Sequence, residues 1–252
     1  MGHKDDYYNR AKQQGYRARS AYKLRQLDDA ADVLGEGDAV VDLGAAPGGW
    51  LQVAAERVGD TGTVLGVDRQ HIDPIDGVET LRGDLTEEAT REEIHETVGE
   101  VDAVLSDMAP EMSGEYDLDH ARSVHLARQA LVVARELLAP GGDLVVKAFD
   151  GRDLDTLEAD VEAAFEYVRT MRPKASREAS SELYLVGKGR LRTDLRAGEE
   201  LAVEIVDTGR EGDGVAKVDG YTLFVPGASE GETVRVRIED VKPRFGFAER
   251  VD

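Results

Sequence analysis

The chain of 252 residues contains no cysteine. Disulfide bonds, cysteine-ligated zinc, iron–sulfur clusters and thiol nucleophiles are therefore excluded. Histidine is also scarce: the chain has five, and only His120 and His125 lie close together in sequence. Because this spacing places two side chains poorly on one helical face, we expect no metal site and no metal cofactor.

Long apolar runs are missing as well. No segment reaches the roughly 20 apolar residues that span a bilayer. The polar segment Met1–Tyr22 lacks the apolar stretch of a secretory signal. We therefore expect a cytoplasmic protein with no membrane partner. Hydrophobic residues make up 41% of the chain, which is enough for a core and argues against global disorder.

Positive charge is unevenly distributed in a chain with a net charge of −21. Residues 1–27 carry seven Lys or Arg against two acids, and residues 169–192 carry seven against two. Residues 28–168 have a net charge of −25, and residues 193–252 one of −6. The two basic segments could be ordinary solvated stretches. We favour a polyanion-binding face built from both.

The acidity predicts a dependence on salt. Arginine outnumbers lysine 23 to 8, and both features suit a salt-adapted, solvated surface. Because potassium chloride screens repulsion among the acids, we expect the free energy of unfolding and the activity to rise with salt into the molar range. Thermal unfolding and activity across a salt series measure this. A chain that is fully stable and active without added salt would contradict the expectation.

The order of the apolar segments predicts an α/β fold. Strand-like segments alternate with helix-like ones, which is typical of a doubly wound, mostly parallel, Rossmann-like sheet. The expected strands are 39–43, 63–68, 77–84, 101–107 and 143–149, and the expected helices are 50–58, 87–98, 120–138 and 154–165. Segments 166–173 and 181–189 follow each other without a helix, so we expect an antiparallel pair at one edge.

The pattern changes after Gly189. Short runs with a period of two, separated by glycine-rich turns, predict a small all-β barrel of about five strands. The expected strands are 201–209, 214–220, 221–227, 232–241 and 245–251. We therefore expect two domains, over residues 1–189 and 194–252.

The strongest local signal is the segment Val40–Trp50. A strand that ends in Asp42-Leu43-Gly44 leads through a turn of small residues to Gly48-Gly49. Such residues let a ligand lie close to the backbone, at the strand ends where open α/β sheets bind ligands. A dinucleotide site is an alternative, but the glycine spacing does not fit GxGxxG.

Acids end the next three predicted strands. Asp68 ends the second strand, where a carboxylate can accept hydrogen bonds from ribose hydroxyls. Asp84 ends the third, where an acid can contact the edge of an adenine, and Asp107 ends the fourth. Each acid alone could be a solvated strand end or a helix cap. Three in succession at one edge favour a ligand site.

Four motifs in order, VDLGAAPGGW, SDMAP, VKAFDG and SELYLVG, resemble the FtsJ/RrmJ (RlmE) family of ribosomal RNA ribose 2′-O-methyltransferases. The resemblance runs from about Ala18 to Gly189. It implies S-adenosyl-L-methionine as cofactor and ribosomal RNA as partner, within the large ribosomal subunit. The implied cofactor contacts are Gly48, Trp50, Asp68, Asp84 and Asp107.

The resemblance also implies a catalytic tetrad of Lys23, Asp107, Lys147 and Glu182. A ribose hydroxyl is a poor nucleophile that must lose its proton as it attacks the methyl group. A lysine in a confined site beside another cation can act as the base. We assign that role to Lys147, with Asp107 orienting it and with Lys23 and Glu182 holding the ribose.

The basic segments supply the expected RNA face. We expect residues 1–27 to form a basic helix beside the active site, with the loop 172–177 as the opposite lip. The interleaved side chains are Tyr7, Tyr8, Tyr16 and Tyr22 with Arg10, Lys12, Arg17, Arg19 and Lys23. The alternative is that the tyrosines pack on the domain.

The tail from about Asp194 to Asp252 resembles a TRAM domain, as in archaeal relatives of the family. It either stabilises the chain, contacts a ribosomal protein or binds RNA. A local RNA face would comprise Arg210, Lys217, Arg244, Phe245 and Phe247.

We therefore expect methyl transfer to the 2′-hydroxyl of a uridine in large-subunit (23S) ribosomal RNA. Two alternatives stay open at this point. One is 2′-O-methylation of transfer RNA, and the other is a non-catalytic ribosome-assembly factor.

Overall fold

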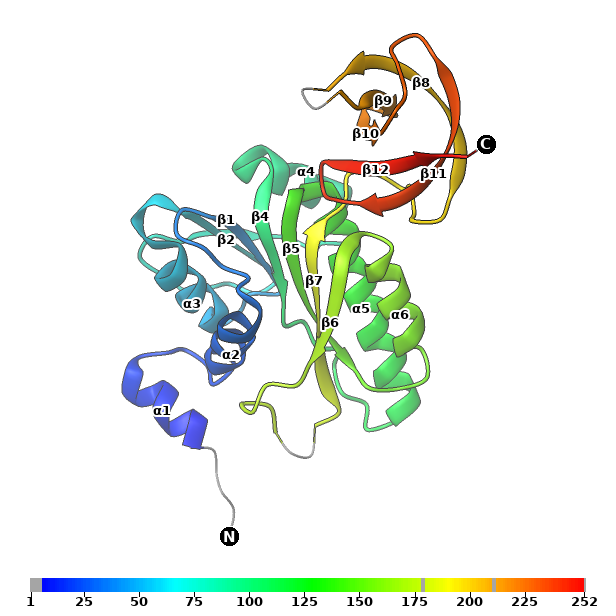
Figure 1. Cartoon of the computed structure of the whole chain (residues 1–252). Coiled ribbons are helices and arrows are strands. Elements are labelled where there is room, and N and C mark those ends of the chain that lie inside the picture. Colours follow the sequence, from blue (N-terminus) through cyan, green and yellow to red (C-terminus); the bar gives the residue numbers. More distant parts are fainter. Residues whose placement is uncertain (1–5, 178–179, 210–211, 252) are drawn as a thin grey trace.

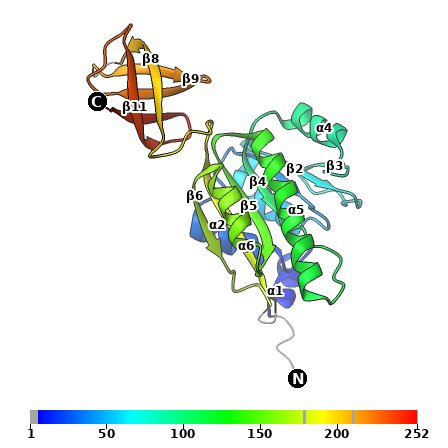
Figure 2. The same cartoon turned by 90° about the vertical axis from the view of Figure 1, so that its right-hand side faces the viewer.

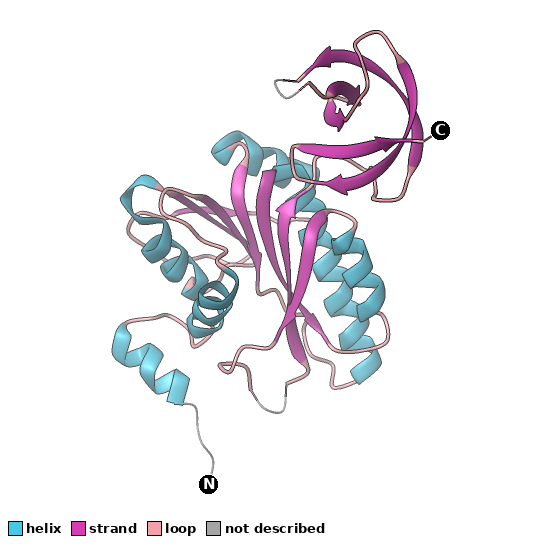
Figure 3. Cartoon of the chain, in the orientation of Figure 1, coloured by secondary structure: helices cyan, strands magenta, loops and turns pink. Residues whose placement is uncertain are grey.

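The computed structural model describes residues 6–177, 180–209 and 212–251. It contains an α/β domain and a closed β-barrel (Figures 1 and 3). No helix in these ranges is long and apolar enough to cross a membrane.

The α/β domain is built on a seven-stranded sheet in the order β3-β2-β1-β4-β5-β7-β6. The strands from β3 to β5 pair in parallel, which confirms the predicted doubly wound sheet. β7 pairs antiparallel with both β5 and β6, which confirms the expected hairpin at one edge. The strands are β1 Ala39–Leu43, β2 Thr63–Asp68, β3 Glu79–Arg82, β4 Val101–Ser106, β5 Leu138–Phe149, β6 Phe165–Met171 and β7 Glu182–Arg190.

Helices cover both faces of this sheet, because its central strands are apolar on both sides. Val40 packs in the core beneath α2 and α3, whereas Val41 packs beneath α4, α5 and α6. Because the strands from β3 to β5 run parallel, their carboxyl ends all lie at one edge of the sheet, which the two helix layers leave open. The helices are α1 Asp6–Gln14, α2 Ala21–Ala31, α3 Gly49–Val58, α4 Glu88–Val98, α5 Tyr116–Leu137 and α6 Leu154–Glu162, with a 3-10 turn at Gly59–Thr61.

The expectation of one basic helix over residues 1–27 is wrong. The structure has two helices, α1 and α2, and residues 1–5 lie outside the described ranges. Gly15 has a φ of 79°, a left-handed conformation that ends α1. Tyr16 then turns into the core, and its hydroxyl donates to Glu56 Oε2 at 2.7 Å.

Other element boundaries differ by a few residues. α5 begins at Tyr116, before the expected start, and Asp119 in its first turn accepts hydrogen bonds from the backbone N–H groups of Ser113 and Gly114. β5 begins at Leu138, directly after α5. Pro140-Gly141-Gly142, which follows the expected helix, therefore lies in the strand.

The C-terminal strands close into a barrel in the order β10-β12-β11-β8-β9, which confirms the predicted all-β architecture. Closure leaves no unpaired strand edge. The strands are β8 Glu200–Thr208, β9 Gly214–Val218, β10 Tyr221–Val225, β11 Thr233–Val241 and β12 Phe245–Arg250.

The barrel sits at the amino end of the parallel strands, away from α1 (Figures 1 and 2). Lys242 Nζ donates to Glu166 Oε1 at 2.7 Å, and Arg196 Nη2 donates to the Ala163 carbonyl at 2.6 Å. The barrel is thus anchored to the base of the sheet, opposite the strand ends expected to hold the site.

Candidate functional site

A cavity of about 1320 Å³ opens at the carboxyl ends of β1 to β4, where the sequence predicts the ligand site. Gly44, Asp68, Asp84 and Asp107 all line it. Helix α5 forms the far wall through Arg122, His125 and Gln129, among others. The three strand-end acids thus converge as expected.

The glycine turn above β1 is conformationally demanding. Gly44 has a φ of 75°, and a Cβ added there would stand 2.3 Å from Met108 Cγ. Gly48 has a φ of 105° at the start of α3, and its Cβ would stand 2.8 Å from Ile75 Cδ1. Both positions therefore require glycine, which keeps the turn narrow.

Gly48 and Trp50 do not line the cavity. The Trp50 side chain is 2% exposed, and its Nε1 donates to the Ser20 carbonyl at 2.8 Å. Its ring lies 5.8 Å from that of Tyr184. The Trp50 side chain therefore joins α3 to α2 and to the sheet. The cofactor contacts predicted for Gly48 and Trp50 stay predictions. With its side chain used in this way, Trp50 could contact the cofactor only through its backbone.

Asp68 and Asp84 are held in place by neighbouring donors. Asp68 accepts from the backbone N–H groups of Ala46, at 3.0 Å, and Gln70, at 2.7 Å. Asp84 Oδ1 accepts from Thr86 N at 3.0 Å and Oγ1 at 2.8 Å. These hydrogen bonds lower the pKa of Asp84, and Arg69 adds to the effect. Asp84 therefore stays ionised at neutral pH.

Asp42 lies behind this cavity and is 1% exposed. Both of its carboxyl oxygens lack a hydrogen-bond partner among the described residues. Burial raises the pKa of Asp42 well above its usual range, and the charges of Asp107 and Asp68 add to the shift. Burial therefore favours the uncharged form of Asp42. The ionised carboxylate of Asp84 on the cavity wall, in contrast, favours a ligand that carries positive charge.

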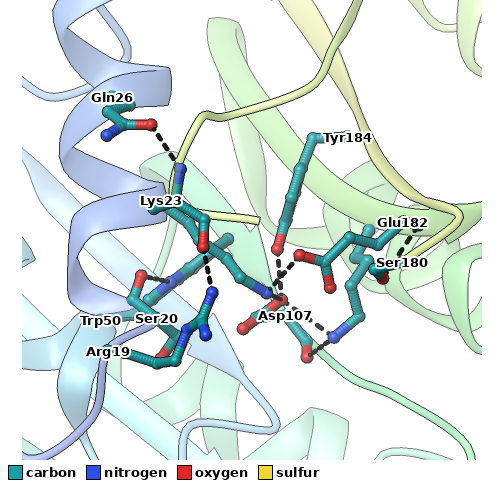
Figure 4. A network of polar contacts seen from close by, with 11 residues as sticks. Arg19, Ser20, Lys23, Gln26, Trp50, Asp107, Ser180, Glu182 and Tyr184 are labelled. Atoms are coloured by element: carbon teal, nitrogen blue, oxygen red, sulfur yellow. Dashed lines mark hydrogen bonds and ion pairs between the residues drawn. The ribbon is translucent and has the colours of Figure 1, made fainter. Parts of the chain in front are cut away.

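The four residues of the predicted tetrad meet beside the cavity, although they come from four distant segments. Figure 4 shows Lys23, Asp107 and Glu182 pointing toward one another. Lys147 Nζ donates to Asp107 Oδ1 at 2.9 Å and to the Asp107 carbonyl at 2.5 Å. Lys23 Nζ lies 2.8 Å from Glu182 Oε1 and 3.8 Å from Asp107 Oδ1. Both lysines and Glu182 are at least nine-tenths buried. The geometry therefore gives two opposite-charge pairs, Lys147–Asp107 and Lys23–Glu182, which the longer contact between Lys23 and Asp107 joins.

Tyr184 is a member of this network that our sequence reasoning missed. Its hydroxyl donates to Asp107 Oδ1 at 2.6 Å, and Lys23 Nζ lies 5.7 Å from its ring centre. Burial raises the pKa of Tyr184 well above its usual range, and Asp107 and Glu182 add to the shift. The hydroxyl therefore remains a donor. The available signal was a tyrosine within the apolar run Leu183–Val186, because a buried hydroxyl needs a partner.

His120 fixes the loop that follows the strand of Lys147. The Asp153 backbone N–H donates to His120 Nε2 at 3.1 Å, so Nδ1 is the protonated nitrogen and donates to the Phe149 carbonyl at 3.0 Å. The hydroxyl of Tyr116 donates to the Asp150 carbonyl at 2.5 Å. Both ring nitrogens of His120 are therefore used in positioning this loop.

The expected RNA face is only partly available. Arg17 donates to the carbonyls of Asp73 and Pro74, both at 2.6 Å, and Arg19 donates to the Ala175 carbonyl at 2.5 Å. These two arginines thus bind backbone within the domain, and Arg19 joins α2 to the loop 172–177. Tyr16 packs in the core, as the alternative for the tyrosines supposed, whereas Tyr8 is exposed. The basic side chains of this face that remain exposed are Arg10, Lys12, Arg172, Lys174 and Arg177.

Comparisons with known proteins agree with this geometry. Residues 16–190 match the family described as FtsJ-like methyltransferase, and residues 195–251 match the TRAM domain. The chain is 67% identical over 252 residues to a Natronomonas pharaonis protein named ribosomal RNA large subunit methyltransferase E, with 100% of both chains covered. It is 63% identical over 263 residues to a Haloarcula marismortui protein of the same name, again with 100% of both covered.

A solved structure from Plasmodium falciparum, described as a ribosomal RNA methyltransferase, has the same fold. The TM-score is 0.63 at 29% identity, and the match covers 69% of this chain and 98% of that one. With the matched family segment spanning the whole sheet and the tetrad, the chain belongs to the FtsJ-like methyltransferase family and carries a TRAM domain at its carboxyl end.

Proposed function

We propose that the protein transfers a methyl group from S-adenosyl-L-methionine to the ribose 2′-hydroxyl of a uridine in large-subunit (23S) ribosomal RNA. The observation that carries the proposal is the buried cluster of Lys23, Asp107, Lys147 and Glu182 at the edge of the acid-lined cavity. In this proposal residues 1–189 carry the reaction and residues 194–252 form an accessory module.

The cavity fits the proposed cofactor. S-adenosyl-L-methionine supplies an electrophilic methyl group on a positively charged sulfur. The carboxylates of Asp68 and Asp107, which line the cavity, suit that charge. Asp68 would accept from the ribose hydroxyls and Asp84 from the adenine amino group, since each oxygen can accept a second hydrogen bond.

Residues of the chain would remove the proton of the 2′-hydroxyl. Lys147 reaches the reaction edge from β5, and its Nζ donates to the backbone carbonyl of Asp107 at 2.5 Å and to Asp107 Oδ1 at 2.9 Å. We assign it as the base that takes the proton of the 2′-hydroxyl during attack. The Lys23–Glu182 pair would hold the ribose in line with the methyl group. Because both reactants are large, holding them in this orientation supplies much of the acceleration.

Two observations support ribosomal RNA as the substrate. The relatives that match over their full length are named for the large ribosomal subunit. The lip residues Arg10, Lys12, Lys174 and Arg177 are exposed, which suits phosphate contacts. Transfer RNA would use the same chemistry and is the second candidate, because the tetrad acts on a ribose and not on a base.

Replacing Tyr184 by Phe should lower kcat by roughly tenfold or more while leaving cofactor affinity unchanged. The change removes only the hydroxyl that donates to Asp107, and a hydrogen bond to a charged group contributes about 1.5–3 kcal/mol. Single-turnover methyl transfer and calorimetric cofactor binding measure the two quantities. Tyr167→Phe, at an exposed position on β6, is the matched control. Equal kcat in the two variants would remove Tyr184 from the positioning network.

The acceptor is tested by methyl transfer from labelled S-adenosyl-L-methionine, in high salt, to large ribosomal subunits and separately to bulk transfer RNA. We expect incorporation into the subunits. Incorporation into transfer RNA alone would keep the chemistry and overturn the substrate. Absence of incorporation into either, despite tight cofactor binding, would favour the assembly-factor alternative.

A further inference from the structure

Helix α5 holds the end of strand β5 through side chains on one helical face. Tyr116, His120 and Ser123 follow one another at spacings of four and three residues, which places them together. The Phe149 N–H donates to Ser123 Oγ at 3.0 Å, and His120 Nδ1 donates to the Phe149 carbonyl at 3.0 Å. Tyr116 holds the next carbonyl, that of Asp150, at 2.5 Å. The backbone is therefore fixed where β5 ends.

Phe149 lies where the tetrad is assembled. It follows Lys147 by two residues on β5, so the two side chains lie on the same face of the strand. Its register partner on the antiparallel strand β7 is Glu182, and that of Lys147 is Tyr184. A shift of the β5 end would therefore move Lys147 and Glu182 relative to Asp107.

His120 is enclosed by the loop that it holds. The residue is 2% exposed, and its Nε2 accepts from the Asp153 N–H at 3.1 Å. A Cβ added at Gly151 would stand 2.6 Å from His120 Cγ. The loop backbone thus lies directly against the imidazole ring, and this close approach requires glycine at position 151.

The two hydrogen bonds of the ring explain why a histidine is buried here. A buried polar ring costs free energy unless its nitrogens have partners, and an apolar side chain would fill the same space without that cost. One nitrogen of His120 donates and the other accepts, which only the neutral ring can do. A protonated ring would direct a second N–H at the Asp153 N–H. The position therefore selects one neutral tautomer, with the proton on Nδ1.

We propose that His120 is a positioning residue for methyl transfer. As the neutral Nδ1–H tautomer it holds the Phe149 carbonyl, and through the β5 end it sets the positions of Lys147 and Glu182. This inference rests on the proposed function, since it treats the tetrad as the reacting centre. It deepens that function by assigning a role to a side chain that acts through the backbone and not on the substrate.

Substitutions of His120 separate its two hydrogen bonds. The amide of His120→Asn lies near the Nδ1 position and can still donate to the Phe149 carbonyl, whereas that of His120→Gln reaches the Nε2 position and can accept from the Asp153 N–H. His120→Phe keeps the ring volume and loses both bonds. Because a misplacement of about 1 Å can cost 10²-fold in rate, we expect kcat to fall by roughly 10²-fold in His120→Phe and His120→Gln. His120→Asn should recover most of that loss, and KM and the cofactor Kd should stay unchanged.

Gly151→Ala tests the same contact from the side of the loop. The added Cβ would displace the ring or the loop, so kcat should again fall by roughly 10²-fold. His95→Phe, at an exposed histidine on α4, is the matched control and should keep the native kcat. Thermal unfolding in high salt shows which variants are folded at the assay temperature.

A readout that needs no methyl transfer is the NMR spectrum of the full chain with isotope-labelled histidine and lysine. The His120 signals, identified by their loss in His120→Asn, should show the neutral Nδ1–H form. The Lys147 Cε signal, identified with Lys147→Arg, should shift in His120→Phe and stay in place in His120→Asn.

A proton on Nε2 in the native chain, or a Lys147 signal unchanged in His120→Phe, would overturn the positioning role. So would a folded His120→Phe with the native kcat, or equal losses of kcat in His120→Asn and His120→Phe. If the native chain methylated no ribose, the proposed function would fail, while the lysine spectrum would still report whether His120 positions Lys147. The two failures are therefore distinguishable.

Discussion

Replacing Lys147 by Ala is expected to lower kcat by roughly 10²- to 10⁴-fold, the range for loss of a general base. Lys147 is 6% exposed and contacts Asp107 through two oxygens, so its amine is held at the reaction edge. The cofactor Kd should change little, because Lys147 does not line the cavity. Single-turnover transfer and calorimetric binding of S-adenosyl-L-methionine measure both quantities.

Lys147→Arg sharpens this test. Arginine keeps the positive charge but cannot lose its proton in proteins. If Lys147 is the base, Lys147→Arg should therefore be as inactive as Lys147→Ala. Lys242→Ala, which removes a lysine at the barrel junction, is the control. If Lys147→Ala supported ribosome assembly as well as the native chain does, the assembly-factor alternative would hold. If Lys147→Arg kept full activity, the lysine would act by charge alone.

Replacing Trp50 by Ala is expected to lower the free energy of unfolding by about 3–5 kcal/mol, the usual cost of removing a buried large aromatic side chain. The ring fills the space between α2, α3 and the sheet, and its Nε1 donates to the Ser20 carbonyl at the start of α2. Because α2 carries Lys23, the same change should lower methyl transfer. Denaturant unfolding in high salt measures the stability.

Trp50→Phe separates packing from the hydrogen bond. It keeps much of the aromatic volume and loses the Nε1 donor, so we expect a smaller loss, about 1–2 kcal/mol. Tyr167→Ala, at an exposed position, should lie within about 0.5 kcal/mol of the native chain. A Trp50→Ala variant as stable as Tyr167→Ala would show that the ring does not hold α2.

Much of the fold could be predicted because its determinants are local and periodic. Each of the central strands carries an apolar run, and the doubly wound sheet was predicted from the alternation of such runs with helix-like segments. The barrel was predicted from short runs with a period of two between glycine-rich turns. The break at Gly15 was missed, because a glycine inside a polar segment is compatible with a continuous helix. The helix ends there because the side chain of Tyr16 packs in the core. Tertiary burial, which no local pattern shows, decided that boundary.

In the candidate site, too, the residues that lie in sequence motifs were predicted, whereas the contacts that depend on the tertiary structure were not. Lys23, Asp107, Lys147 and Glu182 were chosen from motifs, and the fold brings their side chains together. The hydrogen bond of Tyr184 to Asp107 was not predicted, since it joins segments 77 residues apart. Nor was the use of Arg17 to bind carbonyls within the domain, because sequence shows charge but not which acceptor an arginine reaches.

The central claim is that the methyl group goes to a ribose oxygen. The most direct measurement is nucleoside mass spectrometry of large-subunit RNA methylated by the native chain, with digestion products separated into base- and ribose-methylated forms. We predict 2′-O-methyluridine at one position, resistant to alkaline cleavage of its 3′ phosphodiester and absent with Lys147→Ala. A methyl group on a base, with alkaline cleavage unaffected, would contradict the account.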